Sequence, residues 1–320
     1  MKNETLHTVI DNMHQARVLV IGDVMLDMYE HCMVKRISPE APVPIATVVD
    51  DSYFLGGAGN VANNARALGA KVSLVGVIGT DREGDVLREI VAQNGIDHDG
   101  LVVEDGRVTT LKKRVVSGTQ QLIRIDREMT HNIKDSTQTA LRSVLATKIK
   151  ECDVIVISDY CKGIFTESLI NYIKEEAKKD DKKILVDSKS RNLPMYSGVY
   201  LIKPNKGEAE VFVDETFAHD YANLEKVGRR ISSILDLNLV ITLGKDGMAL
   251  FAQDTFSHMK TEVLQVFDVS GAGDTVLSVL AVAVATGAKL EEAVHLSNIA
   301  AGHVVSDEKT AWHPRVKRRP

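Results

Sequence analysis

The strongest constraint on the fold is a regular alternation of short β-branched runs with longer segments of helical periodicity. Strands are expected at residues 17–21, 71–78, 153–157, 183–186 and 239–242, and helices near 81–94, 135–150, 166–179, 221–235 and 290–305. Strands separated by helices pair in parallel, and the helices cover both faces of the sheet. The pattern therefore predicts an α/β fold with a mostly parallel sheet flanked by helices on both faces.

Two segments interrupt this rhythm, namely residues 30–54, rich in Val and Pro, and residues 107–127, where apolar and polar residues alternate. Both are typical of half-buried strands without intervening helices, and they predict a small β-strand lid or oligomer surface beside a cleft. A chain of 320 residues fits one α/β domain with a small appendage better than two equal domains. We therefore expect a single domain over residues 1–320.

Composition excludes several classes of protein. The net charge of −5 gives no bulk attraction to nucleic acid or to an anionic membrane, so neither is an expected partner. The three cysteines have no C-x-x-C spacing, which argues against disulfides or a thiolate zinc site and suits the cytoplasm. No apolar stretch reaches the ~18 residues of a membrane span, and the start has no signal-peptide pattern. The basic tail at residues 312–320 is interpreted as a solvated end.

Residues 268–275, Asp-Val-Ser-Gly-Ala-Gly-Asp-Thr, lead into an apolar helix that stops at Gly287. Glycines let backbone N–H groups close on a ligand, and the start of a helix attracts anions, so a phosphate site is predicted here. A carboxylate in such a loop opposes anion binding, which favours Asp274 as a base for a hydroxyl that attacks the phosphate. The ordinary alternative is a tight turn with an N-capping aspartate.

A second glycine cluster, at residues 56–59, also precedes a helix. Gly57, Gly59 and Ala62 satisfy a loose dinucleotide-binding pattern, with Asp81 at the distance expected for a ribose contact. However, residues 50–54 are not a continuous buried strand. A nicotinamide-dependent dehydrogenase is therefore kept only as an alternative.

Several polar groups follow predicted strands, at the sheet edge where α/β proteins bind ligands. Asp23 and Asp27 follow the first strand, and Asp27 is the favoured ligand for sugar hydroxyls, with Asp23 structural. Asn205 and Glu208 either form a helix capping box or act on hydrated Mg²⁺ and a triphosphate. The turn at residues 242–247 is either a hairpin or part of a nucleotide site.

The order of these motifs along nearly the whole chain resembles the ribokinase, or phosphofructokinase-B, family of sugar kinases. The resemblance implies a ribokinase-like fold, ATP and Mg²⁺ as cofactors, Asp274 as catalytic base and an anion hole at Gly271, Ala272 and Gly273. The residues implied to bind nucleotide or metal are Asp187, Asn205, Lys206, Glu208, Thr242, Gly244, Gly247, Asp268 and Asn298, of which Asn205 and Glu208 would act on the metal through water. Asp27, Gly57 and Asn60 would hold the sugar, and the lid strands would form a homodimer.

Within this family, residues 22–27 and 36–44 are most similar to kinases that phosphorylate the anomeric C1 hydroxyl of D-glycero-D-manno-heptose 7-phosphate during lipopolysaccharide core synthesis. A separate adenylyltransferase is then expected to act later. The substrate's own phosphate needs cations, for which the candidates are Lys35, Arg36, Arg124, Lys162 and Lys189. A kinase for fructose, fructose phosphate or ribose is the main alternative, and a non-catalytic sugar-binding module is the least favoured.

Overall fold

The computed structural model describes residues 3–216, 221–252, 255–261 and 271–306. Across these residues the main sheet has nine strands. In spatial order they are β13 (Thr255–Met259), β12 (Met248–Ala252), β11 (Asn238–Thr242), β10 (Leu201–Ile202), β9 (Lys183–Ser188), β8 (Val154–Asp159), β1 (Arg17–Gly22), β4 (Lys71–Ile78) and β5 (Asp97–Val103). The strands from β11 to β5 pair in parallel, whereas β12 and β13 add an antiparallel edge.

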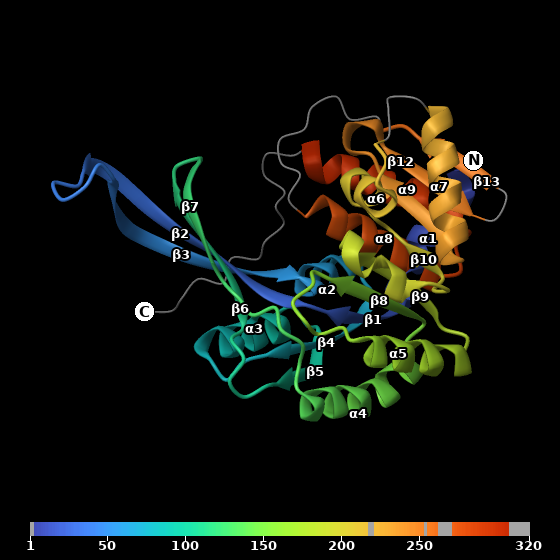
Figure 1. The fold of residues 1–320 in the computed structure, drawn as a ribbon, viewed down its shortest axis with the longest axis horizontal. Helices are drawn as coiled ribbons and strands as arrows, with labels where there is room; N and C mark the ends of the chain where they lie inside the picture. Colours follow the sequence, from blue (N-terminus) through green and yellow to red (C-terminus); the bar gives the residue numbers. More distant parts are fainter. Residues whose placement is uncertain (1–2, 217–220, 253–254, 262–270, 307–320) are drawn as a thin grey trace.

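Helices cover both faces of this sheet, as the alternation predicted (Figure 1). Along β1, Val18 and Val20 belong to one buried cluster, and Leu19 and Ile21 belong to the other. The first face carries α1 (Asn3–Asn12), α2 (Ala58–Ala67), α3 (Arg82–Gln93), α8 (Ala272–Ala285) and α9 (Leu290–Ser306). The second carries α4 (Asp135–Glu151), α5 (Glu167–Lys179), α6 (Lys206–Val213) and α7 (Tyr221–Leu235). Short 3-10 helices span Met13–Gln15, Ser190–Tyr196 and Gly244–Asp246. The predicted α/β fold is confirmed.

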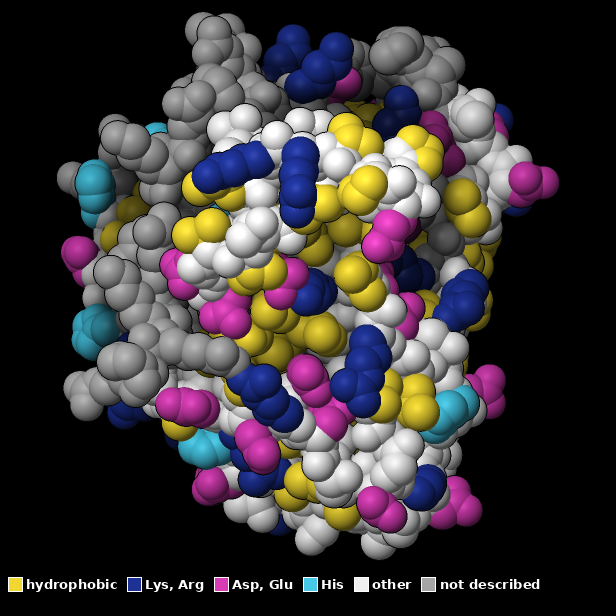
Figure 2. All heavy atoms as spheres, turned by 90° about the vertical axis from the view of Figure 1, so that its left-hand side faces the viewer, with side chains coloured by type: hydrophobic (Ala, Val, Ile, Leu, Met, Phe, Trp, Pro, Cys, Tyr) yellow, Lys and Arg dark blue, Asp and Glu magenta, His cyan; other side chains and the backbone are white. Residues whose placement is uncertain are grey.

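A separate four-stranded sheet lies beside this body, and we refer to it as the lid. Its order is β3 (Pro44–Gly57), β2 (Val24–Ile37), β6 (Thr110–Ser117) and β7 (Gln120–Arg127). The β2–β3 hairpin projects far from the body, with the shorter β6–β7 hairpin beside it (Figure 1). On the face toward which the hairpin points, hydrophobic side chains gather among charged ones (Figure 2).

The lid begins earlier in the chain than the expected residue 30, because β2 starts directly after β1. Only Asp23 separates the two strands, and the first residues of β2, Val24 to Leu26, are all buried. A continuous buried run lacks the apolar–polar alternation of a half-buried strand, so periodicity could not detect this part of the lid.

Asp23 connects four elements where the lid meets the body. Its backbone N–H donates to Ser158 O (3.1 Å), and its carbonyl accepts from Ala58 N (3.0 Å) at the start of α2. Its carboxylate accepts from the backbone N–H groups of Tyr160 (2.8 Å) and Lys162 (3.1 Å). Burial and the nearby charge of Asp159 raise the pKa of Asp23 to about 7. These contacts agree with the structural role expected for Asp23.

Across the described segments, no helix combines the length and apolar character needed to cross a membrane. Cys32, Cys152 and Cys161 are free and buried.

Candidate active site

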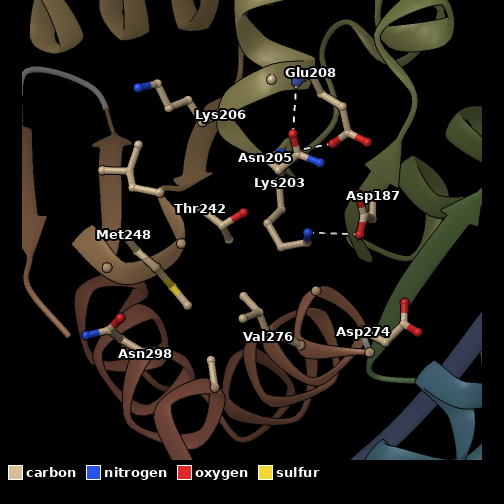
Figure 3. Close-up of a pocket in the computed structure, with 18 of the residues that line it drawn as sticks. Asp187, Lys203, Asn205, Lys206, Glu208, Thr242, Met248, Asp274, Val276 and Asn298 are labelled. Atoms are coloured by element: carbon tan, nitrogen blue, oxygen red, sulfur yellow. Dashed lines mark hydrogen bonds and ion pairs between the residues drawn. The ribbon is translucent and has the colours of Figure 1, made fainter. Parts of the chain in front are cut away.

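A cavity of about 790 Å³ lies at the carboxyl ends of the parallel strands. Its lining comes from the ends of β8, β9 and β11 and from α6, α8 and α9. Asn298 and Met248 lie at one end of this cavity, and Asp274 lies at the other (Figure 3). The volume is that of a site for a small molecule such as a nucleotide.

The start of α8 lies where the glycine pattern predicted a phosphate-attracting element. Gly271 precedes the helix in a left-handed conformation (φ 78°), which glycine adopts without strain. A Cβ on Gly273 would lie 3.5 Å from Lys203 Nζ, so the missing side chain leaves this surface open to a ligand. The first turn of α8 therefore presents unpaired backbone N–H groups and a positive helix end beside a lysine.

Asp274 lies in that first turn and is held by residues from two other parts of the chain. Its Oδ2 accepts a 2.7 Å hydrogen bond from Asn60 Nδ2 in α2, and its Oδ1 accepts a 2.9 Å bond from the Tyr160 hydroxyl after β8. Burial raises the pKa of Asp274 to about 6, although the Asn60 and Tyr160 hydrogen bonds oppose that rise. A fixed carboxylate with such a pKa is well suited to accept a proton near neutral pH.

Buried Lys203 and half-buried Asp187 form an ion pair in the middle of the cavity, with Lys203 Nζ 2.9 Å from Asp187 Oδ2 (Figure 3). Lys203 is only 2% exposed. Burial raises the pKa of Asp187 even though the charge of Lys203 opposes this. The pair places one cation beside the N-terminus of α8, where a transferred phosphoryl group needs charge neutralisation.

The N-terminus of α6 forms a second wall. Asn205 Oδ1 accepts from Glu208 N, and Glu208 Oε2 accepts from Asn205 N, both at 2.9 Å, which is the capping box considered as an alternative role. Glu208 Oε1 lies 2.7 Å from Lys189 Nζ, and Lys189 also lies over the Tyr160 ring. Lys206, at the first position of α6, faces the same cavity.

The remaining wall comes from the β11–β12 turn and α9. Thr242, Gly244 and Gly247 line the cavity around a short 3-10 turn. Asn298 is held in place because its Nδ2 donates to Lys260 O at 2.9 Å. The structure thus brings most of the predicted nucleotide-binding residues to one cavity, whereas Asp268 lies outside the described residues.

The predicted sugar-binding residues lie where the lid joins the body. Gly57 ends β3 and precedes α2 with φ 56°, and a Cβ there would lie 2.4 Å from Asp23 O. Asn60 follows in the first turn of α2 and reaches Asp274. Asp27 on β2 is paired with Arg114 on β6 at 2.6 Å.

The candidate phosphate-binding cations are dispersed. Lys35 and Arg36 lie exposed on the distal part of β2. Arg124 lies on β7, half exposed and paired with Asp126 at 2.9 Å. Lys162 lies beside the lid, paired with Glu128 at 2.7 Å, and Lys189 alone of the five lines the cavity in the described residues.

The dinucleotide-binding alternative has no support in this geometry. The glycine cluster follows the lid strand β3, not a strand of the parallel sheet. Asp81 is occupied as the N-cap of α3, where it accepts from Gly84 N (3.1 Å) and from Thr109 N (2.8 Å). A ribose-binding role for Asp81 is therefore discarded.

Three functional candidates were missed by sequence reasoning. Tyr160 and Lys203 follow strands β8 and β10, a position that carries a signal for ligand binding and places both segments near the cleft, but the sequence assigned neither residue a role. Arg114 lies within a lid strand and gives no signal beyond strand alternation.

The architecture and site define a class of enzyme. A buried carboxylate in the first turn of a helix that begins at a glycine, beside a nucleotide-sized cavity and next to a β-strand lid, is the arrangement expected of a ribokinase-like sugar kinase. Residues 15–313 match the family described as pfkB family carbohydrate kinase. The chain belongs to this family.

Relatives agree with that assignment. The chain is 42% identical over 315 residues to the "Bifunctional protein HldE" of Desulfatibacillum aliphaticivorans, covering 97% of the chain and 64% of that protein. It is 43% identical over 293 residues to the protein of the same name from Caulobacter vibrioides, covering 90% of the chain and 60% of the relative. The chain therefore spans less than two thirds of the length of these curated relatives.

Solved structures share the fold. Phosphofructokinase-2 from Escherichia coli, in its tetrameric inhibited form, matches with a TM-score of 0.74 and 19% identity, over 91% of this chain and 93% of that one. Ribokinase from Arabidopsis thaliana, complexed with ribose and ATP, matches with a TM-score of 0.69 and 17% identity, over 92% and 93%. At these identities the likeness concerns the fold alone.

Proposed function

We propose that this carbohydrate kinase transfers the γ-phosphoryl group of ATP to the anomeric C1 hydroxyl of D-glycero-D-manno-heptose 7-phosphate, giving heptose 1,7-bisphosphate and ADP. The observation that carries the kinase chemistry is the position of Asp274, a carboxylate with a raised pKa in the first turn of a helix that attracts phosphate. The choice of sugar is supported by the resemblance of residues 22–27 and 36–44 to heptose phosphate kinases.

Asp274 acts as the general base. As the substrate oxygen bonds to the γ-phosphorus, its proton passes to the Asp274 carboxylate and the bond from phosphorus to the bridging oxygen of ADP breaks. The backbone N–H groups at Gly271, Ala272 and Gly273 then stabilise the negative charge on the transferred group. Lys203 adds a positive charge on the same side.

The nucleotide occupies the cavity between α6, the β11–β12 turn and α9. Asn298 lies at the end remote from Asp274, which suits the base and ribose, and Thr242, Gly244 and Gly247 line the same cavity. Lys206 and the N-terminus of α6 are placed for the phosphates.

Mg²⁺ fits this site through water molecules and phosphate oxygens. Within the described segments, no group of three or more His, Cys, Asp or Glu side chains could hold a metal ion. Both carboxylate oxygens of Glu208 already have protein partners, Asn205 N and Lys189 Nζ. A strongly hydrated ion suits such a site, with Asn205 and Glu208 orienting its waters, and it would neutralise charge on the phosphates.

The sugar lies under the lid, with Asp27, Gly57 and Asn60 around it. The Asp27 carboxylate accepts hydrogen bonds from sugar hydroxyls, while Asn60 connects the sugar site to the base. We assign the reaction to the cytoplasm, where ATP is available and the free thiols of Cys32, Cys152 and Cys161 stay reduced. An adenylyltransferase would act later on this product's pathway.

We further propose that two copies of the chain associate through their lids. Exposed hydrophobic side chains are concentrated there, at Met33, Ile37, Val43, Val48, Val49, Ile123 and Ile125. A large exposed apolar surface is a common mark of a protein interface.

A coupled assay of ADP release with Mg²⁺ tests the function, using heptose 7-phosphate, fructose 6-phosphate, fructose and ribose as acceptors. The heptose phosphate should be turned over selectively, and Asp274→Asn should lower kcat by about 10²–10⁴-fold with folding intact. Preference for another sugar would overturn the substrate but not the kinase chemistry. Near-normal turnover by Asp274→Asn would overturn the assignment of the base.

A further inference from the structure

One face of the lid carries a cluster of paired charges, of which only Asp27 has a role in the proposed reaction. Strand register places Asp27 beside Lys112 across β2 and β6, and Lys112 beside Asp126 across β6 and β7. Residues paired directly across strands share a face of the sheet. The contacts agree, because Lys112 Nζ lies 3.3 Å from Asp126 Oδ2, and Arg114, two residues along β6, reaches Asp27. We call this face the inner lid face.

The inner lid face is turned toward the site of phosphoryl transfer. Lys162 Nζ reaches across to Glu128 Oε1 at 2.7 Å, just beyond the end of β7, and Lys162 is two residues after Tyr160, which binds Asp274. The opposite face of the lid, with Leu26, Met28 and Leu111, borders a separate small pocket against α3. The cations on the inner face therefore lie between the lid and the catalytic loop.

These charges are unusual for a protein surface because their side chains are mostly buried. Lys112 is 19% exposed, Arg114 is 18% and Lys162 is 17%. Ordinary surface lysines extend into water, and holding several cations together at partial burial costs free energy unless an anion compensates. A surface ion pair alone stabilises the protein too little to offset that free-energy cost.

Glu128 is the anion shared by Lys112 and Lys162, and its contact with Lys162 is much shorter than its contact with Lys112. One of its carboxylate oxygens contacts Lys162, whereas the other, Oε2, lies 3.8 Å from Lys112 Nζ. In the part of the chain that the structure describes, this buried Oε2 has no hydrogen-bond partner. A phosphate monoester, with three terminal oxygens and a charge near −2, would bridge Lys112 and Lys162 better than one carboxylate does.

We propose that Lys112 and Lys162 bind the phosphate group at the far end of the sugar substrate, and that Glu128 holds the two lysines in place until that phosphate displaces it. The inference rests on the proposed function, in which the acceptor is a sugar phosphate. Lys112 and Lys162 replace Lys35, Arg36 and Arg124 as candidates for binding the substrate's phosphate, because those three side chains lie exposed on the lid strands. Arg114 stays with Asp27 and orients that carboxylate toward the sugar hydroxyls.

The test compares acceptors with and without the distal phosphate, namely heptose 7-phosphate against heptose and fructose 6-phosphate against fructose. Lys112→Gln and Lys162→Gln should each raise KM for the phosphorylated acceptor about ten- to a hundredfold. The KM values for ATP and for the unphosphorylated sugar should change less than about threefold. Glu128→Gln should lower KM for the phosphorylated acceptor, an improvement that general structural damage would not produce.

Lys113→Gln is the matched control, since Lys113 neighbours Lys112 on β6 but pairs with Glu30 at 2.7 Å. Equal effects of Lys112→Gln and Lys113→Gln, equal loss on both acceptors, or a raised KM in Glu128→Gln would each overturn the proposal. If wild type uses heptose 7-phosphate but the lysine variants behave like the control, the phosphate site is wrong and the proposed function stands. If it uses another sugar phosphate with the expected lysine dependence, the heptose assignment is wrong and the phosphate site stands.

Discussion

The phenolic hydroxyl of Tyr160 donates a 2.9 Å hydrogen bond to Oδ1 of Asp274, joining the loop after β8 to the first turn of α8. Tyr160 is half-buried, and desolvation together with the charge of Asp274 raises the pKa of its own hydroxyl well above the ordinary value. The phenol therefore stays protonated and acts as a fixed donor that stabilises the carboxylate form of the base.

Tyr160→Phe should consequently move the pH dependence of the reaction. Without the donor, the pKa of Asp274 rises above about 6, so the acid limb of kcat/KM should shift upward by about one pH unit. Activity at pH 6 should fall about fivefold and recover near pH 9. Tyr172→Phe removes a hydroxyl that donates to Arg142 O instead, and it should leave the profile unchanged. A uniform loss at every pH would contradict this role for Tyr160.

Lys203→Met should destabilise the protein and weaken ATP binding together. Removing the buried lysine leaves Asp187 without its 2.9 Å partner, which typically costs about 3–5 kcal/mol in unfolding free energy. Urea unfolding and the KM for ATP measure the two effects. Adding Asp187→Asn should recover much of the stability but not the KM, because the cation is still missing. A double variant no more stable than Lys203→Met would show that the pair is not coupled.

Asp23→Asn should flatten the pH dependence of stability. Since the pKa of Asp23 rises from 3.8 to about 7 on folding, the folded state binds more protons than the unfolded state between those values. Stability is therefore lost as pH rises from about 4 to 7, by up to about 4 kcal/mol from this group. Denaturant unfolding at pH 5 and pH 8 should show a smaller loss in Asp23→Asn than in wild type. Equal losses would mean that Asp23 does not titrate in this range.

Charges on the projecting hairpin should separate the proposed dimer. Val48 and Val49 on β3 are 54% and 66% exposed, so replacing both with Glu should leave the monomer folded while opposing association of two lids. Sedimentation equilibrium gives the mass of each form. Ile234→Glu, at a position on α7 that is 55% exposed, is the matched control and should not change the mass. A monomeric wild type, or a double variant with unchanged dimer mass, would overturn the proposed association.

Much of the α/β body could be predicted from local sequence, because burying one face of a helix or strand makes its apolar residues recur at a short, regular spacing. The five expected parallel strands and the helices between them are all present. Asp274, Asn205 and Glu208 were found from spacing, since helix starts have local signatures. By contrast, the antiparallel edge of the main sheet, β12 and β13, was only partly predicted. These short strands follow the last parallel strand, and only β12 was suggested, as the second strand of a hairpin at residues 242–247.

The partners of the base could not be predicted in the same way. Tyr160 and Asn60 meet Asp274 across sequence separations of 114 and 214 residues. Nothing in the local pattern around either residue specifies such a contact. Lys112 and Lys113 illustrate the same limit, because they are identical neighbours with opposite surroundings that only the strand register distinguishes.

Asp23 is the only residue between the central strand β1 and the lid strand β2, and its carboxylate holds the backbone of Tyr160 and Lys162. The junction between the lid and the body is thus hydrogen-bonded to the loop whose Tyr160 contacts Asp274. The hydrogen-bond chain from Asp23 through the Tyr160 loop to Asp274 therefore gives the lid and the proposed proton acceptor a common anchor.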